Sequence, residues 1–280
     1  MMLANPEDQK LLREIERWEA SRFKTGIASA ALAVVFRPVD RLVNAMLPDM
    51  IMEKIVDPMR RVLEAIQNTS QKFVNVADIV KKANKAGVQV KNFREFRKMP
   101  TPYLDALAKS FFNRSVIETT LQGAALGTGG YAMMLLDIPM LWMVNFKMVL
   151  QIGTCYGFDP ASPKEREFAL RIFCMASADS EKERRKDLHE MDKMIMNFQK
   201  RGVLVGRLRK AAIRETIQVI INRELRSFAK HRAPRGVPVI GTALGGAFSY
   251  VFTKEIATYA YMLYRKRLIQ ERLSALRGKQ

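Results

Sequence analysis

The segment DLHEMDK, at residues 187–193, brings together the side chains best suited to metal chemistry. His189 and Asp192 stand three residues apart with Glu190 beside the histidine, so a helix would place the imidazole and a carboxylate on one face. An HExxH zinc motif would need a second histidine where Lys193 stands. A solvated, charged helix explains the segment better, and we expect neither a bound metal nor another cofactor.

Sequence motifs for hydrolysis and phosphate binding do not occur in the chain. The serine elbow GxSxG and the phosphate loop GxxxxGK[ST] are both missing. The two cysteines, Cys155 and Cys174, form no CxxC pair, which argues against a zinc finger and a disulfide framework. We therefore expect no catalytic residue. Asp137 is a candidate functional carboxylate, although a helix-capping role explains its place before Ile138 and Pro139 better.

Net charge is the strongest global signal in the composition. The chain has 47 Lys and Arg against 28 Asp and Glu, which gives a net charge of +19 and a pI near 10.1. Such a charge favours anionic partners, namely phospholipid surfaces, nucleic acids or acidic proteins. The apolar fraction of 48% and the mean hydropathy of −0.12 indicate a folded globular protein rather than a disordered chain or a polytopic membrane protein.

Two basic segments are candidates for binding phosphates. Residues 206–235 have the composition of a helix that lies along nucleic acid, but we find no helix-turn-helix, zinc module or aromatic platform beside them. Residues 264–279 combine basic side chains with a preceding aromatic stretch, which is typical of a membrane-facing rim. We predict an anionic-lipid surface there, because three consecutive cations span most of a helical turn and are not expected all to point inward. Its residues are Arg265, Lys266, Arg267 and Arg272.

Helix signals occur along the whole chain, and no strand-like alternation with hairpin turns is found. Ser162, followed by Pro163 and then Glu165, predicts a helix start with a capping box. Residues 106–156 predict two long helices that meet near Asp137, with Gly157 ending the second in the left-handed conformation. A last long helix is predicted from Pro238 to about residue 276. The predicted fold class is all-α.

Two glycine pairs predict a close crossing of helices. Gly123 and Gly127 are four residues apart, as are Gly241 and Gly245, so each pair lies on one helical face and leaves a flat groove for another backbone. We therefore predict a compact multi-helix bundle with these two glycine-rich helices buried at its centre.

The lengths of the two apolar segments decide between lipid and a protein core. Residues 121–136 and 237–252 are free of charge, and each would reach roughly 24 Å as a helix. A hydrocarbon layer needs about 30 Å, so a packed core is favoured, with shallow insertion of a hairpin and true spanning as the alternatives. We expect one domain over 1–280, with a division into 1–100 and 101–280 as the alternative. The acidic N-terminus does not predict a signal peptide, which favours a cytoplasmic location.

Three sequence blocks resemble the EcsC family. They are ERWEASRF near the start, GAALGTGGYAMMLLDIPML with QIGTCYGFDPASPKEREFAL, and VPVIGTALGGAFSYVFTKEIATYAYMLYRKRL, so the resemblance covers residues 18–268 approximately. It implies a helical, mostly bacterial family without recognised catalytic machinery, named for a gene beside an ABC exporter and presumed to associate with membranes. This chain departs from the family in being notably basic.

Together these features predict a non-enzymatic, peripheral protein associated with the inner membrane, which supports a membrane transporter or an envelope process. The expected partners are an anionic membrane surface and an ABC transporter or another membrane protein. A lipid- or peptide-acting hydrolase with an unrecognised site is one alternative. A nucleic-acid-binding protein is the second.

Overall fold

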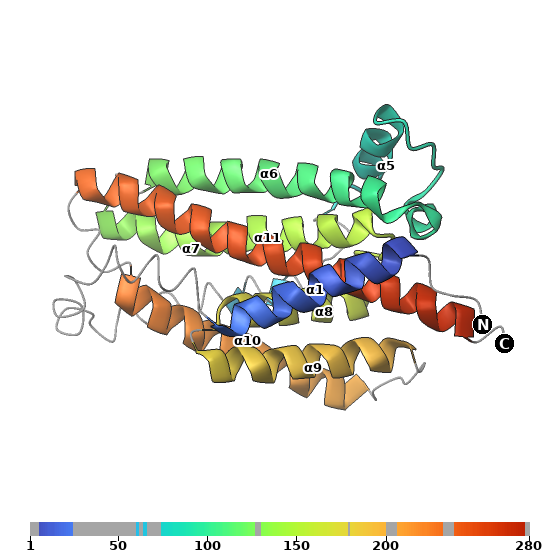
Figure 1. Ribbon diagram of the computed structural model, residues 1–280. Helices are drawn as coiled ribbons and strands as arrows, with labels where there is room; N and C mark the ends of the chain where they lie inside the picture. Colours follow the sequence, from blue (N-terminus) through green and yellow to red (C-terminus); the bar gives the residue numbers. More distant parts are fainter. Residues whose placement is uncertain are drawn as a thin grey trace.

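The computed structural model describes residues 6–24, 60–61, 64–65, 74–126, 130–178, 180–199, 206–231 and 238–277. All regular structure in these ranges is helical, which confirms the all-α class (Figure 1). The helices are α1 (Pro6–Lys24), α5 (Val76–Lys85), the 3₁₀ helix η2 (Phe93–Lys98), α6 (Thr101–Leu126), α7 (Gly130–Cys155), α8 (Pro163–Ala176), α9 (Glu181–Gln199), α10 (Gly206–His231) and α11 (Pro238–Arg277).

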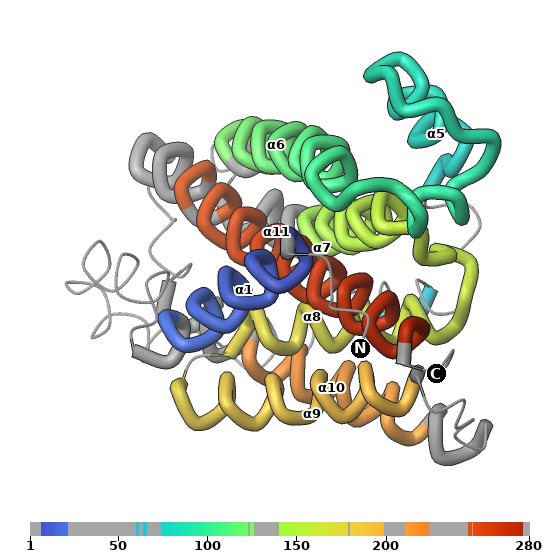
Figure 2. The backbone as a smooth tube through the Cα atoms, turned by 45° about the vertical axis from the view of Figure 1, so that its right-hand side comes forward, coloured from blue at the N-terminus to red at the C-terminus, as the bar shows by residue number. Residues whose placement is uncertain are grey.

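Helix α11 is the axis of the bundle. It runs diagonally between α6 and α7 on one side and α8, α9 and α10 on the other, with α1 lying across it (Figures 1 and 2). Its buried apolar side chains occur at consecutive positions, so they point in all directions and the helix is enclosed rather than amphipathic. They are Ile256, Ala257, Tyr259, Ala260, Tyr261, Leu263, Tyr264, Leu268 and Ile269.

Helices α6 and α7 form an antiparallel pair that packs on α11, and their boundary corrects the sequence prediction. Helix α6 ends at Leu126 and α7 begins at Gly130, so Asp137 lies about two turns inside α7 and does not cap its start. The glycines at 127, 129 and 130 explain the difference. A glycine inside a helix costs about 1 kcal/mol relative to alanine. Three glycines therefore disfavour a continuous helix about as much as one interior proline such as Pro139, which costs roughly 3 kcal/mol.

The C-terminal half of α7 belongs to the protein core. Trp142, Phe146 and Ile152 are buried, and Trp142 and Phe146 both pack against Phe173 of α8. These residues follow the charge-free segment 121–136, for which a packed core stays a prediction. Among the residues that the structure describes, no helix is both long and apolar enough to be a candidate membrane span.

The turn between α7 and α8 follows the local sequence signals closely. Gly157 has a φ of +84°, the left-handed conformation predicted for it. Ser162 caps α8, because its hydroxyl accepts a hydrogen bond from the N–H of Lys164. The predicted capping box is wrong, since the N–H of Ser162 binds the carbonyl of Asp159 and the side chain of Glu165 points into the core.

Helices α5 and η2 lie at the end of the bundle where α1 begins and α11 ends (Figure 1). Ile79 of α5 and Phe96 of η2 are fully buried and belong to the same apolar cluster as the residues of α7, α8 and α11. Because half of the N-terminal hundred residues lie outside the described ranges, the number of domains stays a prediction.

Candidate functional site

The four cations predicted to form a lipid-binding surface lie inside the protein or against its backbone. Arg265, Lys266 and Arg267 are only 4%, 8% and 4% exposed, and each forms ion pairs with carboxylates. The prediction was wrong because it assumed that α11 has one buried face. Helices α1, α6, α8 and α9 surround α11 at this level, and each supplies an acidic side chain.

Arg265 joins α11 to α6 and α1. Its guanidinium lies 2.8 Å from a carboxylate oxygen of Asp105 in α6 and 3.1 Å from one of Glu14 in α1. The second oxygen of Asp105 accepts a hydrogen bond of 2.7 Å from the hydroxyl of Tyr156. Two groups from distant parts of the chain therefore hold this buried carboxylate.

Lys266 points in another direction and joins α1 to α9. Its ammonium donates hydrogen bonds of 2.7 Å to Glu19 and of 2.7 Å to Asp192. Asp192 is one of the residues considered above as a metal ligand, and its carboxylate is engaged in this pair. The rest of that motif separates on α9, where His189 is exposed and Glu190 binds Lys193. No three His, Cys, Asp or Glu side chains in the described ranges gather closely enough to hold a metal ion.

Arg267 is the most enclosed of the three cations. Its guanidinium donates two parallel hydrogen bonds to Glu165, of 2.8 and 2.7 Å, and a third of 3.1 Å to Glu271. Three aromatic rings surround it, with centroids 4.1 to 5.0 Å from its central carbon. These rings belong to Phe158, Phe168 and Phe198. Cation–π attraction in such a dry site adds to the ion pair.

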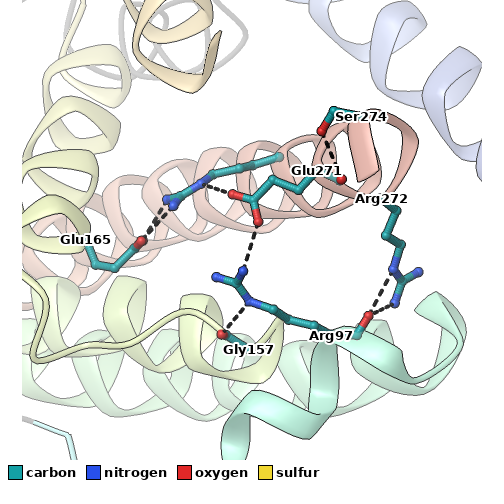
Figure 3. Close-up of polar contacts among 7 residues, drawn as sticks. Arg97, Gly157, Glu165, Glu271, Arg272 and Ser274 are labelled. Atoms are coloured by element: carbon teal, nitrogen blue, oxygen red, sulfur yellow. Dashed lines mark hydrogen bonds and ion pairs between the residues drawn. The ribbon is translucent and has the colours of Figure 1, made fainter. Parts of the chain in front are cut away.

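A further set of polar contacts joins the C-terminal end of α11 to η2 and to the turn after α7 (Figure 3). Glu271 accepts a hydrogen bond of 3.1 Å from Arg97, and the Nε of Arg97 donates to the carbonyl of Gly157. Arg272 donates to the carbonyl oxygens of Arg97 and Met99, which end η2. Arg272 is thus a cap for the neighbouring backbone, and three-quarters of its side-chain surface is covered.

A second buried ion pair lies between α8, α9 and α10. Arg223 of α10 binds the carboxylate of Asp187 in α9 and the carbonyl of Cys174 in α8. It ties the outer helix pair to the core helix α8. Both networks therefore consist of cations whose partners come from separate helices, an arrangement that fixes the relative positions of the helices.

The titratable groups of these networks are poorly placed for catalysis. Burial raises the pKa of Glu19, Glu165 and Asp187, while the paired cation of each opposes the rise. Burial also raises the pKa of the Cys155 thiol, and it raises that of Cys174 to about 12. A nucleophilic thiol needs a lowered pKa and solvent access, and these two have neither. We interpret the networks as structural.

The predicted close crossing of two helices can be examined at Gly246, the residue next to Gly245. A Cβ on Gly246 of α11 would lie 3.4 Å from the Cβ of Ala124 and 3.4 Å from the carbonyl oxygen of Thr120, both in α6. The two helices therefore approach closely beside Gly245. Of the four predicted positions, Gly123 lies in α6 and Gly241 and Gly245 in α11, and Gly127 lies outside the described residues. Their role in the crossing stays a prediction, as does a functional role for Asp137 in α7.

The described surface has several large, exposed apolar side chains on three helices that pack together. The C-terminal half of α6 lies there beside the middle of α7 and the N-terminal part of α11, in the left half of Figure 1. Five large apolar side chains on these helices are between 41% and 66% exposed. They are Ile117, Leu121, Met140, Met143 and Tyr250, and we call them the exposed apolar group. Clustered exposed apolar surface marks sites of interaction with proteins or membranes.

Sequence reasoning missed the burial of the cations of α11, their acidic partners in the core and the exposed apolar group. The segment YMLYRKRLIQ did carry a signal that its cations are buried. Large apolar residues flank the cation run on both sides and occur at every helical angle, which indicates an enclosed helix. The partner carboxylates had no comparable signal. Glu14, Glu19 and Asp105 stand in ordinary amphipathic segments, and only the packing shows which of their faces is covered.

Comparison with known proteins gives a consistent family match. The model of the EcsC protein family matches residues 9–269. The protein YdbA of Bacillus subtilis (strain 168) is 27% identical over 264 residues, which cover 94% of this chain and 93% of YdbA. Protein EcsC of the same organism is 21% identical over 266 residues, which cover 95% of this chain and 98% of that protein. No solved structure matches the chain.

Proposed function

The chain belongs to the EcsC protein family, and from this premise we propose that it is a non-enzymatic protein that binds the inner face of a cell membrane peripherally and supports a membrane transporter or an envelope process. The observation that carries the proposal is the exposed apolar group on a chain of net charge +19. A positively charged protein is attracted to anionic lipid headgroups, and exposed apolar side chains can enter the interface.

The buried networks support the non-enzymatic part of the proposal. Each buried cation of α11 is matched by carboxylates, so its charge is used within the fold and not held ready for a substrate. The protein then acts by occupying a surface rather than by turning over a substrate. The link to a transporter rests on the family resemblance, and its binding partner is a membrane protein in this proposal.

Sedimentation with lipid vesicles tests the proposal. Purified protein is mixed with vesicles of phosphatidylcholine alone or with phosphatidylglycerol added, at neutral pH and at about 0.1 M and about 1 M salt. We expect sedimentation with the anionic vesicles at the lower salt and at least about fivefold weaker binding at the higher, because the screening length falls from about 10 to about 3 Å.

Two outcomes would contradict the proposal. Failure to sediment with anionic vesicles at the lower salt would show that the protein does not bind this surface. Complete displacement from the vesicles by duplex DNA at an equal concentration of phosphate would favour the nucleic-acid alternative.

A further inference from the structure

An open groove lies between α5 and the segment that leads into η2. Its volume is about 690 Å³, within the range of roughly 300–1,000 Å³ that is usual for small-ligand sites. Nine residues line it, six of them in α5 and three at 91–93. We call it the α5 groove, and the side chains that matter here are three apolar and three basic ones, namely Val76, Val80, Phe93, Lys81, Lys85 and Lys91.

The local fold holds both walls of the α5 groove in place. Ile79 and Ala83 anchor one side of α5 in the core, so the side that carries the lysines faces outward. The chain turns back after α5 at Gly87, which has a φ of +88°. The side chain of Asn84 then forms two hydrogen bonds, of 3.0 and 2.9 Å, with the backbone of Val90. These bonds fix the returning chain against α5, so the groove is preformed.

The α5 groove lies in a strongly basic part of the chain. Residues 81–98 contain seven basic residues and one acidic residue, Glu95, whose two oxygens accept hydrogen bonds from the neighbouring chain. Lys82 lies over an aromatic ring, and Arg94 and Arg97 pair with carboxylates. Within the described ranges the remaining four cations have no ion-pair partner. They are Lys81, Lys85, Lys91 and Lys98.

This positive charge differs from that of α11. The buried cations of α11 are matched by carboxylates from other helices, so the fold itself uses their charge. Three unmatched lysines line the α5 groove, and all three are exposed. Lys81 and Lys85 are one helical turn apart on α5, and Lys91 belongs to the other wall. The groove therefore presents ammonium groups from two sides to an anion.

The mixture of side chains selects the kind of ligand. Val76, Val80 and Phe93 are half-buried, and a ligand that covers them removes apolar surface from water. A free phosphate would leave these three side chains in water. A standard protein interface uses about 20–30 residues on each side, which is far more than the nine that line the groove. A small amphiphilic anion fits the lining best.

We propose that the α5 groove binds one anionic phospholipid, with the phosphate between the lysines and the first acyl carbons along Val76, Val80 and Phe93. The inference rests on the proposed function, because it gives the membrane contact a specific lipid-binding site. Helix α5 stands outside α6 at the upper right of Figures 1 and 2, so a bilayer can approach the groove without meeting the rest of the bundle.

Calorimetric titration with a soluble lipid tests the site. Dihexanoylphosphatidylglycerol, kept below the concentration at which it forms micelles, is titrated into the full chain at neutral pH. We expect one molecule bound per chain. Dihexanoylphosphatidylcholine should bind at least about tenfold more weakly, because its headgroup has no net charge. Inorganic phosphate should also bind at least about tenfold more weakly, because it has no apolar part.

Two matched pairs of lysines test the basic side of the groove. The variant Lys81→Gln with Lys85→Gln should bind the soluble anionic lipid roughly 30-fold more weakly than the parent. The control, Lys182→Gln with Lys186→Gln, removes two exposed lysines at the same spacing on α9, at the opposite side of the bundle in Figure 1. It should change binding by less than about twofold. Circular dichroism and thermal melting check that both variants keep the fold.

A neutral variant separates the shape of the groove from its charge. Ala77 is exposed and lines the groove, so Ala77→Trp should obstruct the site and weaken lipid binding without changing the net charge. Ala106→Trp makes the same substitution at an exposed position of α6 and should bind like the parent.

Three results would overturn the inference. The first is a parent chain that does not bind the soluble anionic lipid. The second is an equal loss of binding in the two lysine pairs. The third is inorganic phosphate or hexaglutamate that binds as tightly as the lipid, which would assign the lysines to a free anion or to an acidic protein segment.

Vesicle sedimentation separates this inference from the proposed function. If the parent sediments with anionic vesicles but does not bind the soluble lipid, peripheral binding stands and the α5 groove is not its site. If the soluble lipid binds and responds to the variants as expected while the parent does not sediment with vesicles, the site stands and the proposed function is wrong.

Discussion

The guanidinium of Arg267 in α11 binds both carboxylate oxygens of Glu165 in α8, at 2.8 and 2.7 Å, with both side chains about 5% exposed. A bidentate pair of this kind fixes the angle between the two groups as well as their distance. It joins the start of α8 to the central helix, and the phenylalanine rings around the guanidinium keep water away.

Loss of one partner should therefore be costly. We expect Arg267→Ala to lower the free energy of unfolding by about 3–5 kcal/mol, because it leaves the carboxylate of Glu165 buried and unpaired. Urea denaturation followed by circular dichroism measures the change. The control Arg185→Ala removes an exposed i,i+4 pair with Glu181 and should cost about 0.5 kcal/mol or less.

The double variant Glu165→Gln with Arg267→Met extends this test. It removes both charges, so we expect it to recover more than half of the stability that Arg267→Ala loses. Equal losses in Arg267→Ala and Arg185→Ala would show that the Glu165 pair is open to solvent, contrary to the packing described here.

The crossing of α6 and α11 should tolerate one carbon at Gly246 and no more. A Cβ would meet Ala124 and Thr120 at 3.4 Å, so Gly246→Ala should change stability by less than about 1 kcal/mol, with better helix propensity offsetting the contact. Gly246→Leu should cost about 1–3 kcal/mol or more by overpacking, and the sequence prediction for Gly245→Leu has the same sign. Thermal melting compares the variants, and a leucine variant that melts like the alanine variant would place this face against open space.

Gly157 and Gly87 form a matched pair for separating backbone strain from contact. Both have a positive φ, of +84° and +88°, so alanine at either position costs about 1–2 kcal/mol in backbone strain. A Cβ at Gly87 meets nothing within 4 Å, whereas at Gly157 it would lie 2.5 Å from the Cγ of Arg97. Gly157→Ala should therefore lose more stability in urea than Gly87→Ala, and equal losses would show that Arg97 moves away freely.

Stability should fall in alkaline solution because of the buried tyrosines. Burial raises the pKa of Tyr156 and of Tyr264 well above the usual 10.0, and the charge of Asp105 adds to the rise at Tyr156. Above about pH 10 the unfolded chain releases these protons and the native protein keeps them, so the free energy of unfolding decreases as the pH rises. The urea midpoint at pH 8, 10 and 11 measures the loss.

Variants assign this alkaline loss to a residue. Tyr156→Phe should show a smaller decrease between pH 8 and 11 than the parent, and Tyr103→Phe, at an exposed position, should behave like the parent. An unchanged slope in Tyr156→Phe would refute the assignment.

The same alkaline loss of stability affects the choice of a membrane-binding test. Alkaline carbonate would both unfold this protein and release it from membranes, so salt at neutral pH is the better test of peripheral binding.

The two thiols should be inert in the native protein. Cys155 and Cys174 are buried, and burial raises the pKa of both, so the reactive thiolate is scarce at neutral pH. Titration with DTNB should detect no thiol in native protein and two in urea. Rapid reaction of either thiol in the folded state would mean that the core around α7 or α8 opens readily.

The sequence by itself determined the features that depend on near neighbours in the chain. Proline, serine and glycine set the start of α8, the left-handed turn at Gly157 and the limits of α11, because caps and backbone conformations are local properties. The all-α class and the family resemblance followed from patterns repeated along the whole chain. The boundary between α6 and α7 was wrongly predicted at Asp137, because several glycines and one proline have similar helical costs and packing decided between them.

Only the tertiary structure decided where the charges point. Arg265, Lys266 and Arg267 are adjacent in sequence and exit α11 in three directions, and a carboxylate from a different helix meets each of them. A cation run on an exposed helix and one on an enclosed helix have the same local sequence, so the choice depends on which helices cover the remaining faces. The same reason explains Glu165, which suits a capping box by its position but binds Arg267, since α8 turns that side chain toward α11.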